Sequence, residues 1–342
     1  MHTLKIILGL IFISLILVLA TEISSVDDLN ITTDKWLWTR EKIIKEPRQQ
    51  IDYALIGSSR IWGAMKPHRM AEVLPGARIW NLANHWVGRD TNYFFIKHLF
   101  KHHDVKNLLV EVTEIEPHPD YIRPHPYARY LIEPSDIMTE ADFLFSSLEP
   151  QEILTYSTEF KDDIKLLLKY VGEVTVRIPR IFLRTAVDRI RGKQRYKDEI
   201  KMNEESLGFN ISDPDFIQDQ KFFNQFNRFK MGDLRSAQAN MPLGSRSDYY
   251  LKKIEKLARK HNVRLIFVYH PTYLYSLPSP QVFYYYETLG DFFLPNLLNI
   301  YHIEYWRNYS HMYGKGADAF TDEILSLLKN GHKSSPHYNV YK

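Results

Sequence analysis

Residues 51–62, IDYALIGSSRIW, contain the stretch that decides the fold. The apolar run Ile51–Ile56 predicts a buried β-strand, and this run ends abruptly in Gly57-Ser58-Ser59-Arg60. Because glycine and serine after a strand are ordinary turn residues, one interpretation is a simple turn. The other interpretation is a serine nucleophile at the carboxyl end of a strand, where doubly wound sheets place their active groups.

Four further strand-like runs come later in the chain, and helical stretches separate them. The runs span residues 77–83, 105–112, 263–271 and, more weakly, 299–306. Helices are expected over 67–74, 91–103, 247–262 and 316–330. Strands that alternate with helices predict a parallel sheet with helices on both faces, and near-continuous apolar runs fit strands buried on both sides. We therefore predict an α/β fold.

The amino-terminal segment predicts a membrane helix. Leu4–Ala20 is apolar apart from Lys5 and Ser14, and a spanning helix needs roughly 17 to 25 residues. Lys5 precedes most of this run and acidic residues come after it, which indicates a body outside the cytoplasm. We favour an uncleaved signal anchor over residues 1–24, followed by a stalk over 25–48. A cleaved signal peptide is the alternative.

A long excursion separates the third and fourth strand-like runs. We interpret residues 118–246 as a helical insertion in a domain that spans 49–342, and a separate domain is the alternative. Residues 176–197 of this excursion, VRIPRIFLRTAVDRIRGKQRYK, are distinctly basic. They fit either a solvated helix face or a surface that attaches to a membrane or an anionic polymer.

Composition excludes several classes of protein. The net charge of +3, with 25% charged residues, is not the strong basic field of a nucleic-acid binder. The chain has no cysteine, so disulfides, thiolate metal sites and cysteine nucleophiles are excluded. The histidine pairs His102-His103 and His118 with His125 lack the spacing of a zinc motif, so we expect no metal and no cofactor.

A serine needs a nearby base, and the base needs a group that fixes its tautomer. His311 precedes the last predicted helix, in a loop where it could reach the sheet edge that carries Ser59. The two blocks together resemble the SGNH, or GDSL-like, hydrolase family. IGSSR matches the family's Gly-Asp-Ser block, with Ser58 at the aspartate position and the nucleophile on Ser59. NYSHMYGKGADAFT (308–321) matches the Asp-x-x-His block, with matches at His311, Gly316, Ala317, Phe320 and Thr321.

The resemblance covers roughly 50–118 and 247–330 and implies a flavodoxin-like three-layer α/β/α sandwich. The Gly-Ser-Ser form, the anchor and the insertion look most like the exported branch, which contains DltD-like and alginate-acetylation-like proteins. That branch implies acyl transfer on a cell-envelope polysaccharide, often beside a membrane-bound O-acyltransferase partner.

The chain departs from the family pattern at three places. Asn308 stands where the family has the triad aspartate, so we expect a Ser59–His311 dyad, a weakened site, or a substitute carboxylate from Glu111, Glu114 or Glu304. The second-block glycine is replaced within NLANHW (81–86), and the third block is missing. The oxyanion hole would then rest on the Ser59 backbone N–H, with help from the 84–88 loop.

Further residues at the ends of the predicted strands could bind substrate: Ser58, Arg60, Asn84, His85 and His270. Trp86 could bind substrate or fill a loop. The sequence thus predicts a membrane-anchored serine acyltransferase or esterase that acts on envelope polysaccharide. A non-catalytic scaffold that binds polymer or an O-acyltransferase is the alternative, and an anchored lipid or peptide esterase would use the same site.

Overall fold

The computed structural model describes residues 35–84, 88–113, 245–273, 280–312 and 314–330. The elements in chain order are α2 (Lys35–Ile44), β1 (Gln50–Ile56), α3 (Ser59–Ala64), α4 (Pro67–Val73), β2 (Ile79–Asn81), α5 (Arg89–His102), β3 (Asp104–Val112), α10 (Ser245–Lys260), β4 (Arg264–Tyr269), α11 (Pro280–Leu289), β5 (Asp291–Phe293), α12 (Leu297–Ile300), the 3-10 turn η5 (Ile303–Tyr305), β6 (Trp306–Asn308), β7 (His311–Met312) and α13 (Gly314–Asn330).

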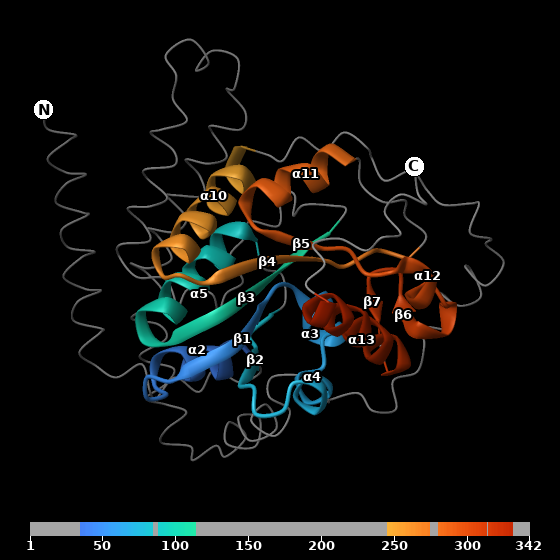
Figure 1. The fold of residues 1–342 in the computed structure, drawn as a ribbon, viewed down its shortest axis with the longest axis horizontal. Coiled ribbons are helices and arrows are strands. Elements are labelled where there is room, and N and C mark those ends of the chain that lie inside the picture. Colours follow the sequence, from blue (N-terminus) through green and yellow to red (C-terminus); the bar gives the residue numbers. More distant parts are fainter. Residues whose placement is uncertain (1–34, 85–87, 114–244, 274–279, 313, 331–342) are drawn as a thin grey trace, which may run out of the picture. The chain divides into compact units, whose positions relative to one another are not determined.

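In the described part of the chain, five parallel strands form the central sheet, in the order β2-β1-β3-β4-β5 (Figure 1). This is one of the two common strand orders of doubly wound folds. The direction in which strands are added to the sheet reverses between β1 and β3, which is the topological switch point. The α/β fold expected from the alternating pattern is therefore confirmed. Each end of the strands β1 to β4 lies within two residues of the end of the run that predicted it.

The prediction of the fifth strand was wrong. Residues 299–306 form the end of α12, the turn η5 and the start of the small β6–β7 hairpin. The fifth sheet strand is instead Asp291–Phe293, a three-residue strand that directly follows α11 and Gly290. A strand this short has no period that a sequence pattern can detect.

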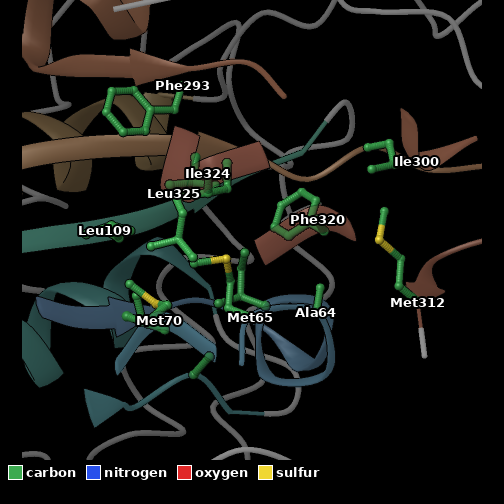
Figure 2. Packing of buried hydrophobic residues seen from close by; sticks show 14 of the residues in the cluster. Ala64, Met65, Met70, Leu109, Phe293, Ile300, Met312, Phe320, Ile324 and Leu325 are labelled. Carbon is green, nitrogen blue, oxygen red and sulfur yellow. The ribbon is translucent and has the colours of Figure 1, made fainter. Parts of the chain in front are cut away.

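One face of the sheet packs against α3, α4 and α13. Figure 2 shows Leu109 and Phe293 from the strands with Phe320, Ile324 and Leu325 of α13, all of which belong to one buried apolar cluster. The opposite face packs against α11, where Tyr286 lies against Phe267, while α5 and α10 contact β3 and β4. Apolar burial on both faces explains why the strands read as continuous apolar runs.

Helix α2 packs onto this core rather than standing apart from it. Trp38 and Ile43 are buried, and the His103 side chain contacts the carbonyl oxygens of Lys42 and Ile43 at 2.9 and 3.0 Å. An imidazole at the carboxyl end of a helix satisfies carbonyls that have no partner within the helix.

The predicted anchor (1–24), the first part of the stalk (25–34) and residues 118–244 of the predicted insertion lie outside the described residues. Among the helices that are described, none is long and apolar enough to cross a membrane. The anchor and the insertion therefore stay predictions.

Candidate active site

The turn after β1 presents two serines at the carboxyl edge of the sheet. Ser58 has extended backbone angles and is the N-cap of α3, and its hydroxyl accepts a hydrogen bond from the Arg60 N–H at 3.2 Å. Serine is a preferred N-cap residue because its oxygen satisfies a backbone donor of the first turn. Ser59 is the first residue of the helix, so its side chain projects from a fixed backbone.

The His311 side chain reaches Ser59 from the other end of the chain. Ser59 Oγ lies 2.8 Å from His311 Nε2, although 252 positions separate the two residues. The hairpin of β6 and β7 supports His311, and the N–H of Tyr273 donates to the Tyr309 carbonyl at 2.7 Å, which ties the hairpin to the segment after β4. Figure 1 shows α3, β7 and α13 side by side at this place.

Asn308 fixes the orientation and the tautomer of His311. Its Oδ1 accepts the backbone N–H groups of Ser310 and His311, both at 3.0 Å, and two N–H donors require an oxygen rather than an amide NH2 there. The same Oδ1 lies 3.0 Å from His311 Nδ1, so Nδ1 carries the proton. Nε2 is then unprotonated in the neutral ring and can accept the Ser59 hydroxyl proton.

The carboxylates named from the sequence do not take the place of Asn308 in the described residues. Glu111 accepts hydrogen bonds from the Ser58 N–H and, at 2.9 Å, from the Ser58 hydroxyl. Glu304 is exposed on η5, where its Oε1 lies 3.9 Å from His302 Nδ1. Glu114 lies outside the described residues.

One donor for an oxyanion is present in the turn. The N–H of Ser58 is taken by Glu111 and that of Arg60 by Ser58 Oγ, whereas the N–H of Ser59 has no hydrogen-bond partner within the described part of the chain. A developing oxyanion on a carbonyl attacked by Ser59 could accept this N–H. This donor belongs to Ser59 itself, and its role toward an oxyanion stays a prediction.

Asn84 comes after β2 but turns its side chain away from Ser59. Its Nδ2 donates to Thr39 Oγ1 at 3.0 Å and to the Leu82 carbonyl at 2.9 Å, and the residue is fully buried. Its backbone N–H donates to the Gly57 carbonyl at 2.9 Å. Asn84 therefore supports the turn at Gly57–Ser59 through its backbone, while His85 and Trp86 lie outside the described residues.

Arg60 and Thr272 line the same edge. Arg60 Nη1 donates to Thr272 Oγ1 at 3.2 Å, which joins α3 to the segment after β4. Sequence reasoning did not name Thr272 or Ser310, whose hydroxyl lies 3.0 Å from His311 Nδ1. The only feature of the sequence that could have indicated these two residues is their position, because each lies within two residues of a predicted site histidine.

His270 lies within the wall of the site. It is 0% exposed, and its ring packs against Phe320 and Trp306 with ring centroids 5.1 and 6.0 Å apart. Burial lowers the pKa of His270 well below its ordinary range, and the nearby positive charge of Arg60 and the neighbouring His311 act in the same direction. His270 is therefore neutral in the folded protein and does not reach the surface where substrate would bind.

Acid is expected to destabilise the protein through His270. Below the ordinary histidine pKa of about 6.5, the unfolded chain binds a proton at this position that the folded chain excludes, so the free energy of unfolding falls as pH falls. One such proton changes that free energy by about 1.4 kcal/mol per pH unit. Denaturant unfolding of wild type and His270→Phe between about pH 7 and 5 would measure it.

The phenyl ring keeps the aromatic contacts, so the difference in slope between the two proteins isolates His270. His103 and His261, whose pKa values burial also lowers, contribute equally to both proteins. Glu111 acts in the opposite direction, because burial raises its pKa and protonation then favours the folded state. Identical slopes for the two proteins would contradict a buried neutral His270.

The histidines considered for a metal lie apart from this edge. His103 caps α2, and His102 ends α5. Within the described ranges, His, Asp and Glu side chains form no group of three that could hold a metal ion. His118 and His125 lie outside those ranges.

Comparison with known proteins identifies no relative: no family model matches the chain, and no curated protein matches it. The arrangement of the site residues, a serine hydroxyl on an imidazole whose other nitrogen is held by an oxygen, is that of a nucleophile with its base and orienting group.

Proposed function

We propose that this chain is a serine acyltransferase or esterase related to the SGNH, or GDSL-like, hydrolases. The observation that supports it most directly is the contact of 2.8 Å between Ser59 Oγ and His311 Nε2, with Asn308 Oδ1 on the other ring nitrogen. The strand order β2-β1-β3-β4-β5 fits the flavodoxin-like sandwich of that family, and the contact lies at the carboxyl edge of this sheet.

The first half of the reaction forms an acyl-enzyme. Ser59 Oγ attacks the carbonyl carbon of an ester while its proton moves to His311 Nε2, and the carbonyl π pair moves onto oxygen. The Ser59 N–H stabilises this oxyanion. When the tetrahedral intermediate collapses, the ester C–O bond breaks and His311 Nε2–H protonates the departing alcohol oxygen.

The second half reverses these steps with a different oxygen. His311 Nε2 removes a proton from the incoming hydroxyl group, whose oxygen attacks the acyl carbon. The bond between that carbon and Ser59 Oγ then breaks, and His311 returns the proton to Ser59 Oγ. A sugar hydroxyl as acceptor gives acyl transfer, and water gives hydrolysis. We propose a cell-envelope polysaccharide as the acyl acceptor or donor, on the resemblance to the exported branch.

The amino-terminal segment supports a proposal for the place of action. We propose that Leu4–Ala20 anchors the chain in the cell membrane with its body outside the cytoplasm, where envelope polymers and a membrane-bound O-acyltransferase partner would be accessible. The basic residues 176–197 would then face anionic lipid or polymer.

Serine labelling of the full chain in detergent tests this proposal. A fluorophosphonate probe is expected to label wild type at Ser59, as located by peptide mass spectrometry, and Ser59→Ala is expected to reduce labelling to background, a loss of at least about 10³-fold. Ser326→Ala, on the exposed side of α13, is the matched control. No labelling of a folded wild type would favour the non-catalytic scaffold, which would keep the fold and bind polymer or partner.

A further inference from the structure

A buried carboxylate lies directly beside the nucleophile turn, and the reaction described above leaves it without a role. Glu111 belongs to the carboxyl end of β3, where it is paired with Val268 of β4, and it is 5% exposed. Val268 and Leu109 belong to the apolar cluster around α3 and α13. A carboxylate in such surroundings is costly unless hydrogen bonds satisfy it.

Both oxygens of Glu111 are satisfied by one residue, Ser58. The Ser58 N–H donates to Oε2, and the Ser58 hydroxyl donates to Oε1 at 2.9 Å. Because that hydroxyl donates its proton to Glu111, its lone pair is left to accept the Arg60 N–H at 3.2 Å. The Glu111 carboxylate thereby fixes the directions of the Ser58 N–H and the Ser58 O–H, next to Ser59.

We propose that Glu111 is a positioning residue for Ser59: it holds Ser58 so that the Ser59 hydroxyl stays on His311 and the Ser59 N–H is left for the oxyanion. This inference rests on the proposed acyl-transfer function. Glu111 acts on the serine side of the site, because Asn308 already occupies Nδ1 of His311.

The backbone around the turn is shaped to this carboxylate. A Cβ on Gly57 would lie 2.5 Å from Glu111 Oε2 and 2.7 Å from Glu111 Cβ, so only glycine lets the turn approach this closely. The Glu111 carbonyl oxygen accepts Arg89 Nη1 at 2.7 Å, which holds the end of β3 from α5. The Glu111 carboxylate is therefore closely packed against the turn at Gly57 and Ser58.

Within the described residues, the charged groups that act on this carboxylate are Arg60 of α3 and Arg89 of α5. Burial raises the pKa of Glu111, and the two guanidinium groups and the Ser58 donors oppose that rise. Protonation would turn one acceptor oxygen into a donor and break the arrangement around Ser58. The turn is therefore expected to need the ionised carboxylate.

The test compares Glu111→Gln with Glu323→Gln in the full chain. A glutamine at 111 is nearly isosteric but replaces one acceptor oxygen by an NH2 group, which cannot satisfy both Ser58 donors. The second-order rate of labelling by the fluorophosphonate is expected to fall about 10²-fold, the usual scale for a displaced reacting group. Glu323 is the matched control, because it also accepts a backbone N–H at 3.1 Å, but from Asn296, the N-cap residue of α12, and not from a residue of the Ser58–Ser59 turn.

The pH profile separates positioning from a general loss of structure. On the acid side, the wild-type rate is expected to fall more steeply than that of Glu111→Gln, because protonation of Glu111 would disturb the turn in addition to any loss of the base. Glu323→Gln is expected to keep the wild-type profile. Identical profiles for wild type and Glu111→Gln, or equal losses of rate in both variants, would overturn the proposal.

Amide hydrogen exchange tests whether Glu111 holds the turn at Ser58, and this test does not require an active enzyme. Exchange at the Ser58 and Arg60 amides is expected to quicken at least about tenfold in Glu111→Gln, while the amides of β1 keep their protection. If the wild type is not labelled but Glu111→Gln still exchanges faster at Ser58 and Arg60, the proposed function would be refuted while the structural role of Glu111 in the turn would stand. A labelled wild type whose rate and amide exchange are both unaltered by Glu111→Gln would refute the role of Glu111 alone.

Discussion

Replacing His311 by alanine is expected to slow the labelling of Ser59 by about 10⁴- to 10⁶-fold, the range seen when the base of a serine site is removed. The reason is geometric: the Ser59 hydroxyl has His311 Nε2 at 2.8 Å as its acceptor, and without the ring its proton passes to water. The side chain of His311 is only partly buried, so the variant should fold. The measurement is the second-order rate of reaction with the fluorophosphonate, read by mass spectrometry.

Variants of Asn308 show whether His311 works as the base or merely lies near Ser59. Asn308→Ala removes the oxygen that holds Nδ1 and should lose most of the rate, whereas Asn308→Asp keeps the contact and adds a negative charge. A hydrogen bond to a charged group exceeds a neutral one by about 1 to 2 kcal/mol, which predicts a gain of about tenfold. A His311→Ala protein that reacts at the wild-type rate would contradict the Ser59–His311 pair.

An asparagine beside His311 need not place the imidazole in the wrong tautomer. In a serine protease, replacing the aspartate by asparagine costs about ten-thousand-fold because the histidine takes the wrong tautomer. Here the N–H groups of Ser310 and His311 hold Oδ1 of Asn308 toward the ring, so the productive tautomer is kept. The missing element is charge, and the site therefore retains the geometry of a triad without its carboxylate.

The alternation of strands and helices predicted the α/β fold, whereas the meeting of Ser59 with His311 was predicted from the resemblance of their two sequence blocks to a known hydrolase family, together with the rule for parallel sheets. Strand ends collect at one edge, and the chemistry-bearing residues of the two blocks lie next to elements at that edge. The same reasoning missed β5, since the three residues Asp291–Phe293 have no measurable alternation. Long apolar runs thus made the centre of the sheet predictable, whereas one short edge strand left no signal in the sequence.

The sequence also could not predict the direction in which individual side chains point. Asn84 and His270 both come after strands at the correct edge, yet one donates to Thr39 and the other is enclosed by Phe320 and Trp306. Glu111 was considered as a partner of His311, and it binds Ser58 instead. Alternation along a strand assigns a face, but only packing decides which neighbour a polar group reaches.

Replacing Gly316 by alanine is expected to destabilise the protein by about 3 kcal/mol or more, the cost of forcing an atom into a packed interior. A Cβ at this position would collide with the carbonyl oxygen of Tyr305 and lie 2.7 Å from its Cβ. The obstacle is the backbone of η5, so no side-chain rotation can relieve it. Urea unfolding followed by circular dichroism would measure the loss as a lower midpoint with an unchanged slope.

Gly63→Ala is the matched control, because Gly63 is also helical but a Cβ there would meet its nearest atom, the Met312 carbonyl oxygen, at an ordinary 3.7 Å. It should stabilise the protein by about 0.5–1 kcal/mol, since glycine within a helix is costly. Gly316→Ala should also slow labelling of Ser59, because η5 leads directly into β6 and Asn308. If Gly316→Ala unfolded at the wild-type midpoint, α13 would not pack against η5 as closely as this contact requires, and the hairpin that carries His311 would be held by other contacts.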